Sequence, residues 1–331
     1  MSFSSTALTP IPTSTVEFYD LHPALEDSYL EVLRGLHTTP KQLSPRFLYD
    51  KRGSELFEEI CTLDEYYPTR TEIQILKEHH QDIAQLLGDG VLIEYGSGSS
   101  QKVRILLDAA DRLSTYVAID ISKQHLYESC VNLAADYPHL TTIAVCADYM
   151  KPITLPPSPG LDQKRRVIFF PGSTIGNMEP DAALQLLRNM ANLVQPQGGV
   201  LIGVDLKKDP KILEPAYDDS QGVSAAFALN VLDHLNRTLH MDFDRDQFSY
   251  KAPYNPEQGR IEMQLVSRVN QVIHLGTIAI SVPEGEAIGT EHSYKFSVEE
   301  FQTLAIRAGF QPKRLWVDDQ QLFSVHYLIA L

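Results

Sequence analysis

Apolar runs alternate with amphipathic segments through the middle of the chain. Four short runs each end in, or lead into, polar residues or glycine, at 91–95, 116–120, 142–146 and 166–170. Runs of this length are typical of buried parallel strands. The intervening segments repeat apolar residues at helical spacing, at 101–112, 122–136 and 180–194. This alternation, with a further apolar run at 199–205, predicts a repeated strand–helix unit and an α/β fold.

The pattern changes after residue 205. A helix is expected to begin at Asp209 and Pro210, and residues 223–239 form a second, strongly periodic segment. Residues 260–270 and 272–282 alternate apolar and polar positions, which predicts an antiparallel pair of strands. A block this long is more than a connection, so we expect an inserted α+β lobe. The remaining segments are expected to complete the first sheet, as a helix at 297–308 and strands at 313–317 and 323–330.

The segment before the first apolar run is expected to be mainly helical. Helical patterns cover residues 26–36 and begin again at Gly53. Thr69 and Glu72 have the spacing of a capping box, which predicts one helix from there to Leu87. These helices precede the strand–helix repeat, and we expect their tyrosines to reach the functional site.

Composition narrows the classes of partner. The chain has 331 residues, 43% of them hydrophobic, which is enough for a buried core in one large domain or two moderate ones. Its formal net charge of −15 repels polyanions, so nucleic acid and anionic membranes are disfavoured as partners. The cysteines Cys61, Cys130 and Cys146 lack metal-ligand spacing, and we expect neither a disulfide nor a metal site. No apolar run approaches the roughly 20 residues of a membrane span, and residues 1–15 do not resemble a signal peptide, so a cytoplasmic protein is expected.

A glycine-rich turn follows the run at 91–95. Gly96 and Gly98 lack a Cβ atom, so the backbone there can turn sharply and approach a ligand closely. On its own, the pair is equally compatible with a tight turn that binds nothing. Asp120 ends the second run, where an acidic residue binds ribose hydroxyls in nucleotide sites, and Asp148 follows the third. Because ligands bind at the carboxyl ends of parallel strands, we expect a nucleoside site here.

Three cofactors suit such a site: NAD, a nucleotide phosphate and S-adenosylmethionine. The chain lacks the G-x-x-x-x-G-K-[ST] loop of triphosphate sites. The third glycine of the dinucleotide fingerprint falls on Gln101, which disfavours NAD. S-adenosylmethionine has no pyrophosphate and does not need that glycine. The acids Glu94, Asp120 and Asp148 suit its positive charge, its ribose and its adenine amino group, so the residues favour a methyltransferase.

The chain also resembles a known family. The segment FFPGSTIGN at residues 169–177 is similar to the signature of the histidine Nα-methyltransferases of ergothioneine biosynthesis. Further segments match in order along the chain: YYPTR at 66–70, IEYGSGSS at 93–100, AYDD at 216–219 and TEHSYKF at 290–296. The resemblance implies a Rossmann-like class I methyltransferase sheet with an inserted α+β substrate-binding lobe. It implies residues 1–70 and 206–295 for the lobe, and 71–205 and 296–331 for the S-adenosylmethionine-binding core.

The same resemblance implies a reaction. S-adenosylmethionine would trimethylate the α-amino group of L-histidine and give hercynine, the first step of ergothioneine biosynthesis, with S-adenosylhomocysteine as the other product. Methyl transfer is an in-line displacement that mainly requires a well-placed neutral amine, so no metal is expected. The expected partner is the small molecule L-histidine, and the expected state is a monomer.

Site residues are implied by matching positions. Asn177 and Tyr49 are the expected catalytic residues at the α-amino group, because an amide oxygen can orient an amine without protonating it. Substrate-binding roles are implied for Tyr66, Gly172, Thr174, Asn177, Tyr217, Met263, Glu291 and Ser293, with Tyr66 and Tyr217 at the carboxylate and Glu291 and Ser293 at the imidazole. Cofactor-binding roles are implied for Glu94, Gly96, Ser97, Gly98, Lys102, Asp120, Asp148 and Tyr149.

Two alternatives stay open. Related fungal enzymes methylate a prenylated tryptophan on the same fold, so another aromatic amino acid is a second candidate substrate. Glu291 with Ser293 favours histidine, since a carboxylate that accepts from a ring N–H discriminates better than apolar contact. Met178 stands where an aromatic residue is more frequent in the family, which alters the shape of the site. The other alternative is an NAD-dependent oxidoreductase.

Overall fold

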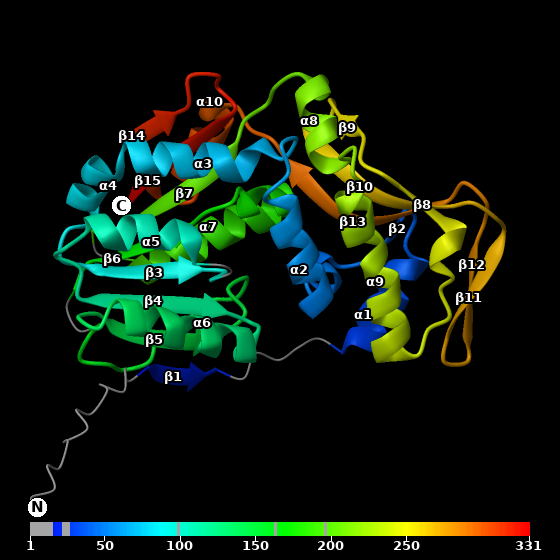
Figure 1. Cartoon of the computed structure of the whole chain (residues 1–331), viewed down its shortest axis with the longest axis horizontal. Coiled ribbons are helices and arrows are strands. Elements are labelled where there is room, and N and C mark those ends of the chain that lie inside the picture. The colour runs from blue at the N-terminus through cyan, green and yellow to red at the C-terminus, as the bar shows by residue number, and fades with distance from the viewer. Residues whose placement is uncertain (1–15, 22–26, 98–99, 162–163, 195–196) are drawn as a thin grey trace, which may run out of the picture.

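A computed structural model describes residues 16–21, 27–97, 100–161, 164–194 and 197–331. The helices and strands form two groups that lie side by side (Figure 1). One group is an eight-stranded sheet between layers of helices. The other is a smaller, five-stranded sheet with its own helices and a separate two-stranded hairpin.

The larger sheet has the strand order β1-β5-β4-β3-β6-β7-β15-β14. Its strands are β1 (Glu17–Asp20), β3 (Val91–Tyr95), β4 (Thr115–Asp120), β5 (Thr141–Cys146), β6 (Arg166–Phe170), β7 (Gly199–Asp205), β14 (Phe310–Val317) and β15 (Phe323–Ala330). Strands β1 to β7 of this sheet are parallel, and β15 is antiparallel to both of its neighbours. The chain order reverses at β3, whose neighbours β4 and β6 lead to opposite edges, and ligands of doubly wound folds bind at that point. The predicted α/β class and Rossmann-like sheet are confirmed.

Helices cover both faces of this sheet. On one face lie α3 (Tyr67–Glu78), α4 (His80–Leu87), α5 (Gln101–Ala109) and α6 (Lys123–Asp136), and on the other lie α7 (Pro180–Val194) and α10 (Val298–Arg307). Strand β3 shows why its sequence is almost continuously apolar. Leu92 packs with the first set of helices and Ile93 with the second, so both faces are buried.

The smaller sheet has the order β2-β13-β10-β8, with β9 paired to β10. Its strands are β2 (Lys41–Gln42), β8 (Phe248–Lys251), β9 (Tyr254–Asn255), β10 (Arg260–Ser267) and β13 (Ala287–Tyr294). The helices that pack with it are α1 (Ser28–His37), α2 (Lys51–Ile60), α8 (Pro210–Tyr217) and α9 (Val223–Leu239). One apolar cluster joins side chains from residues 32–67 with side chains from residues 213–288. Segments from before and after the strand–helix repeat therefore share a core.

The strand pairing expected in the lobe is wrong. Residues 260–270 and 272–282 do not pair with each other: β10 pairs with β13, which comes later in the chain. The second segment is itself a hairpin, in which β11 (Gln271–Leu275) pairs with β12 (Ile278–Val282). Gly276, with φ +61°, lies in the turn between them and adopts a backbone conformation that favours glycine.

The helix expected from Thr69 to Leu87 is also wrong in two respects. It is two helices, α3 and α4, which meet at His79. Thr69 is not its cap, because α3 begins at Tyr67 and the Thr69 hydroxyl donates to the sulfur of Cys61 (3.3 Å).

Strand β1 is an addition to the predicted elements. It pairs with β5 at the edge of the larger sheet, although its residues fall in the segment expected for the lobe. None of the helices in the described ranges combines the length and the apolar character needed to span a membrane.

Candidate active site

The turn after β3 lies where the chain order of the larger sheet reverses. Gly96 has φ +73°, a left-handed conformation that favours glycine, and its N–H donates to the carbonyl of Ile119 (2.9 Å). Ser97 is fully buried, and its hydroxyl has no hydrogen-bond partner among the described residues. Leaving such a group unpaired is costly, so the site is suited to a ligand that completes it. Gly98, also expected to bind the cofactor, lies outside the described residues.

Acidic side chains follow the adjacent strands. Glu94 is buried, and the hydroxyl of Tyr116 donates to its carboxylate (2.5 Å). Burial raises the pKa of Glu94 to about 7, although the hydrogen bond from Tyr116 lowers it. Asp120 ends β4, and its carboxylate accepts from the N–H of Ser122 (2.8 Å). Asp148 follows β5, so three acids meet at the carboxyl edge of neighbouring strands.

Tyr149 connects these acids with the rest of the site. Its ring stacks on Tyr95, with 5.5 Å between the ring centroids. Burial raises the pKa of Tyr149 above its ordinary value. The carboxylates of Asp120, Asp148 and Glu291 raise it further. Negative side chains expected at the cofactor and at the substrate therefore act on one phenol.

Lys102 and Glu72 join α5 to the loop after β6. The ammonium nitrogen of Lys102 lies 2.5 Å from the Glu72 carboxylate, which also accepts from the N–H of Gly172 (2.9 Å). Glu72 is fully buried, and Gly203 permits its approach, because a Cβ at Gly203 would lie 1.9 Å from a Glu72 oxygen. Lys102, an expected cofactor residue, is thus oriented by an acid that the sequence analysis takes for part of a helix cap.

The FFPGSTIGN segment forms the end of β6, a turn and a short 3-10 helix, η2 (Thr174–Asn177). Gly172 has φ +81° in the turn, and Thr174 donates its hydroxyl hydrogen back to the preceding loop (2.9 Å). Gly176 lies directly against β13, where a Cβ would stand 2.6 Å from a backbone oxygen of that strand. The turn and this close approach bring Asn177 to the side of β13.

Asn177 and Tyr49 converge on Glu291. The amide nitrogen of Asn177 donates to Glu291 Oε1 (3.0 Å), and the hydroxyl of Tyr49 donates to the same oxygen (3.4 Å). Glu291 is 8% exposed, and burial raises its pKa to about 8. The hydrogen bond from Tyr49 and the charge of Lys295 act in the opposite direction. Met263 lies opposite Glu291 in the β10–β13 pair and is buried.

Tyr217, Ser293 and Lys295 form the other side of this group. The hydroxyl oxygens of Tyr217 and Ser293 are 2.9 Å apart. Lys295 donates to both, at 2.6 Å to Tyr217 and 2.7 Å to Ser293. The ring of Tyr66 meets the ring of Tyr217 edge-on, with 5.9 Å between centroids. The substrate residues expected on four separate stretches of sequence therefore lie together.

The described site residues fall into two adjoining sets. Around the end of β3 lie Glu94, Gly96, Ser97, Lys102, Asp120, Asp148 and Tyr149, and beside β13 lie Tyr49, Tyr66, Asn177, Tyr217, Met263, Glu291 and Ser293, with Gly172 and Thr174 on the loop between. The sequence analysis gives no role to Glu72, Asp205 or Lys295, which support these sets. Only Lys295 carries a signal, because it continues the every-second-residue spacing of Glu291 and Ser293.

The first set fits S-adenosylmethionine. A buried hydroxyl without a partner at Ser97 and a glycine with left-handed backbone at Gly96 suit close contact with a polar ligand. Asp120 stands where acids bind ribose hydroxyls, and the surrounding carboxylates suit a positively charged sulfonium. Within the described ranges, no group of three or more His, Cys, Asp or Glu side chains is arranged to hold a metal ion.

Comparison with known proteins agrees with these features. Residues 28–330 match the family of histidine-specific, S-adenosylmethionine-dependent methyltransferases. The chain is 40% identical over 302 residues to the histidine N-alpha-methyltransferase of Mycolicibacterium smegmatis, covering 88% of this chain and 93% of that protein. It is 38% identical over 300 residues to the protein of the same name from Mycobacterium tuberculosis, covering 89% and 92%. It is also 30% identical over 303 residues to the 4-dimethylallyltryptophan N-methyltransferase of Arthroderma benhamiae, covering 86% and 88%.

These matches decide between the cofactors that the glycine turn leaves open. They set aside the alternative of an NAD-dependent oxidoreductase and confirm the expected resemblance. The chain belongs to the family of histidine-specific, S-adenosylmethionine-dependent methyltransferases.

Proposed function

We propose that this enzyme trimethylates the α-amino nitrogen of L-histidine and forms hercynine, the first step of ergothioneine biosynthesis. The observation that carries the proposal is the convergence of Asn177 and Tyr49 on the buried Glu291. An amide and a phenol suited to an amine lie beside an acid suited to a ring N–H. The relatives named histidine N-alpha-methyltransferase support the same substrate.

The cofactor is expected in the turn after β3. Asp120 would accept from its ribose hydroxyls, while Tyr149 and Asp148 would line the adjacent strand end. The remaining cofactor residues are Glu94, Gly96, Ser97, Gly98 and Lys102. When bound, S-adenosylmethionine supplies a methyl group that carries positive charge.

Asn177 would orient the reacting amine. Its amide nitrogen donates to Glu291, which leaves the amide oxygen to accept from an amine N–H. An acceptor at this point binds the neutral amine without protonating it and fixes the direction of the lone pair. The hydroxyl of Tyr49, bonded to the same acid, offers the amine a second polar contact.

The other substrate residues would fix the carboxylate and the ring. Tyr66 and Tyr217 are proposed at the α-carboxylate, and Gly172 and Thr174 line the approach from the loop after β6. Glu291 would accept from the imidazole N–H, with Ser293 at the other ring nitrogen and Met263 in the wall. A site that hydrogen-bonds a ring nitrogen rejects analogues without it more strongly than an apolar site does.

Incubation with S-adenosylmethionine and a mixture of free amino acids, followed by mass spectrometry, tests the proposal. We expect a gain of three methyl groups on histidine alone, with release of S-adenosylhomocysteine. Asn177→Ala is the matched control, because it removes the amide at the amine and leaves the Asp120 side of the site intact. Methylation of a different amino acid, or no product from protein that binds S-adenosylmethionine, would contradict the substrate assignment.

A tryptophan derivative is the second candidate substrate, because the chain is similar to a 4-dimethylallyltryptophan N-methyltransferase. Glu291 and Ser293 argue against it. An indole has one N–H and no ring acceptor, so the hydroxyl of Ser293 would lose its partner. Adding 4-dimethylallyltryptophan to the same mixture compares the two substrates directly.

We further propose that the lobe comprises residues 1–70 and 206–295 and that the enzyme acts as a cytoplasmic monomer. The apolar cluster shared by residues 32–67 and 213–288 supports the first statement. The second rests on composition. Size-exclusion chromatography with light scattering tests the monomer.

A further inference from the structure

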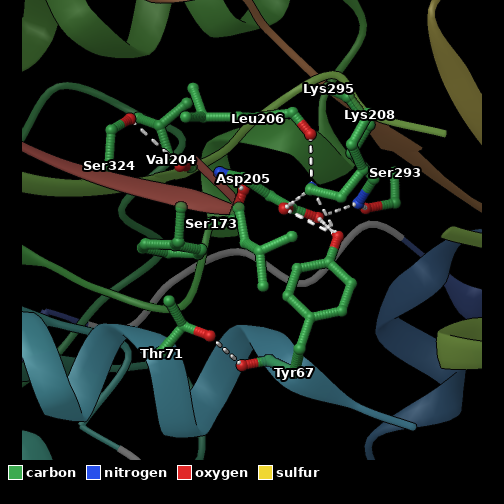
Figure 2. Close-up of polar contacts among 12 residues, drawn as sticks. Tyr67, Thr71, Ser173, Val204, Asp205, Leu206, Lys208, Ser293, Lys295 and Ser324 are labelled. Atoms are coloured by element: carbon green, nitrogen blue, oxygen red, sulfur yellow. Dashed lines mark hydrogen bonds and ion pairs between the residues drawn. The ribbon is translucent and has the colours of Figure 1, made fainter. Parts of the chain in front are cut away.

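A fully buried ion pair lies behind the proposed substrate residues (Figure 2). The side chains of Lys295 and Asp205 are both 0% exposed, and their charged atoms are 2.7 Å apart. Asp205 ends β7 of the larger sheet, and Lys295 follows β13 of the smaller one. Burying charges is costly even when they are paired, so the position of Lys295 calls for an explanation beyond stability.

Asp205 has other partners besides Lys295. Lys208 lies 2.6 Å from its carboxylate, the hydroxyl of Tyr67 donates to it (2.8 Å), and its own N–H donates to Ser173 (2.9 Å). Burial opposes charge on both members of the pair. The attraction between them prevails, so the pKa of Asp205 lies below and that of Lys295 above its ordinary value. One lysine is enough to neutralise the acid, and what Lys295 adds lies on its other side.

The ammonium group of Lys295 has as many N–H bonds as it has acceptors. Its hydrogens go to Asp205, to the Tyr217 hydroxyl (2.6 Å) and to the Ser293 hydroxyl (2.7 Å). An ammonium cannot accept, so each hydroxyl oxygen must receive a hydrogen from it. Tyr217 and Ser293 are also 2.9 Å from each other, so one hydroxyl hydrogen is used between them.

This count leaves a single hydrogen to point out of the group. A phenol is a stronger donor and a weaker acceptor than an aliphatic alcohol, so Tyr217 donates to Ser293. Ser293 then accepts from Lys295 and from Tyr217, and its own O–H is the hydrogen that remains. Tyr217 has no hydrogen left for the α-carboxylate while this contact persists, which assigns the carboxylate to Tyr66.

We propose that Lys295 is a positioning residue that makes Ser293 an obligatory hydrogen-bond donor and thereby selects a substrate ring with an unprotonated nitrogen. The inference rests on the proposed function and deepens it. A neutral imidazole offers one N–H, for Glu291, and one lone pair, for Ser293. A ring with two N–H groups, or with one N–H and no lone pair, meets a donor with a donor or leaves Ser293 unpaired.

The test compares histidine with its two pyrrole analogues, 3-(pyrrol-2-yl)alanine and 3-(pyrrol-3-yl)alanine. Each keeps one ring N–H and replaces the lone-pair nitrogen by C–H. We expect the unmodified enzyme to favour histidine over the better analogue by about 10- to 150-fold in kcat/KM, the value of one buried hydrogen bond. Lys295→Met keeps the length of the side chain and leaves Asp205 with Lys208, and it should reduce that preference to about threefold or less.

A double-mutant cycle separates positioning from a merely structural role. In a Ser293→Ala background, Lys295→Met should leave the preference for histidine unchanged, because the donor is already gone. A structural role would lower the rates on histidine and on the analogues equally and would leave their ratio intact in Lys295→Met, which overturns the inference. If Lys295→Met does not fold, the variant with Asp205→Asn added removes both charges, and the same ratio is measured.

Failure of the proposed function shows differently. It appears as absent trimethylation of histidine by the unmodified enzyme, before any variant is made.

Discussion

Replacing Glu291 by glutamine should uncouple histidine binding from the release of a proton. The pKa of the Glu291 carboxyl is about 8 without ligand, because burial penalises its charged form. At about pH 7 the group is then mostly protonated, with roughly one molecule in ten ionised. It accepts an imidazole N–H strongly only after losing that proton, so binding and ionisation are linked. Glutamine has the same shape and no titrating proton.

The size of the effect follows from the pKa. Ionising Glu291 costs about 1.4 kcal/mol for each unit by which the pH lies below its pKa. Between about pH 7 and pH 9, the dissociation constant of histidine should therefore fall about tenfold more in the unmodified enzyme than in Glu291→Gln. The α-amino group and the ring of histidine titrate alike with both proteins, so their contribution cancels in the comparison.

Stability without ligand should change with the opposite requirement. The pKa of Glu291 is raised in the folded protein from 4.5 to about 8. A group of this kind stabilises the protein fully below its unfolded pKa and loses that contribution as the pH rises through the folded value. The unmodified protein should thus lose more stability than Glu291→Gln between about pH 5 and pH 8, by at most about 4 kcal/mol, in urea unfolding.

Isothermal titration calorimetry measures the proton directly. Histidine is titrated into the enzyme with S-adenosylhomocysteine present, in two buffers of different protonation heat near pH 7. The unmodified enzyme should release about 0.9 proton more than Glu291→Gln. Equal proton release from the two proteins would refute the placement of a protonated Glu291 at the imidazole.

Other substitutions test the remaining parts of the site. Asp120→Ala should weaken S-adenosylmethionine binding by about 10- to 150-fold in calorimetry, because it removes a charge-assisted contact worth roughly 1.5–3 kcal/mol, and unchanged affinity would place the ribose elsewhere. Asn177→Ala should lower kcat on histidine far more than it lowers cofactor affinity, and a rise in KM alone would show that the amide only binds. Gly176→Ala should cost about 1–3 kcal/mol in urea unfolding. Its new Cβ would lie 2.6 Å from the carbonyl of Tyr294, whereas the control Gly289→Ala meets nothing closer than 3.7 Å, so equal stability of the two variants would contradict the packing.

The larger sheet is predictable because its signal is local. Every residue of Val91–Tyr95 is buried, so the strand must be apolar along its whole length apart from the acid it delivers to the site. The same holds for Gly199–Asp205. Short runs of this kind, separated by helical segments of ordinary length, leave little freedom in the order of elements.

Long-range contacts explain the errors. Thr69 and Glu72 have the spacing of a capping box, but Glu72 pairs with Lys102 and with the N–H of Gly172, far away in sequence. No local pattern distinguishes a glutamate that reaches back to its own helix from one that is buried against another. In the lobe, the alternation that begins at Gln271 ends at a glycine turn and belongs to a separate hairpin, while the true partner of β10 comes afterwards.

The site divides in the same way. Asn177 and Glu291 lie in segments distinctive enough to be identified by resemblance. The buried pair of Asp205 and Lys295 depends on strands from two sheets meeting, and neither residue announces this in its neighbourhood. Lysine in particular is mostly a surface residue, so its sequence alone favours solvent.

Strand β13 is held on both faces by the segment that carries Asn177. On one face Asn177 donates to Glu291 (3.0 Å), and on the other the carboxylate of Glu179 contacts both His292 and the hydroxyl of Tyr294, each at 2.6 Å. The residues proposed for the amine and for the ring are therefore fixed relative to each other by contacts from one short stretch of the larger sheet. In-line transfer depends on placement of the amine to well within an ångström. Because the ring is the longer lever, its contact with Glu291 should serve alignment as well as affinity, and Glu291→Gln should lower kcat on histidine in addition to weakening its binding.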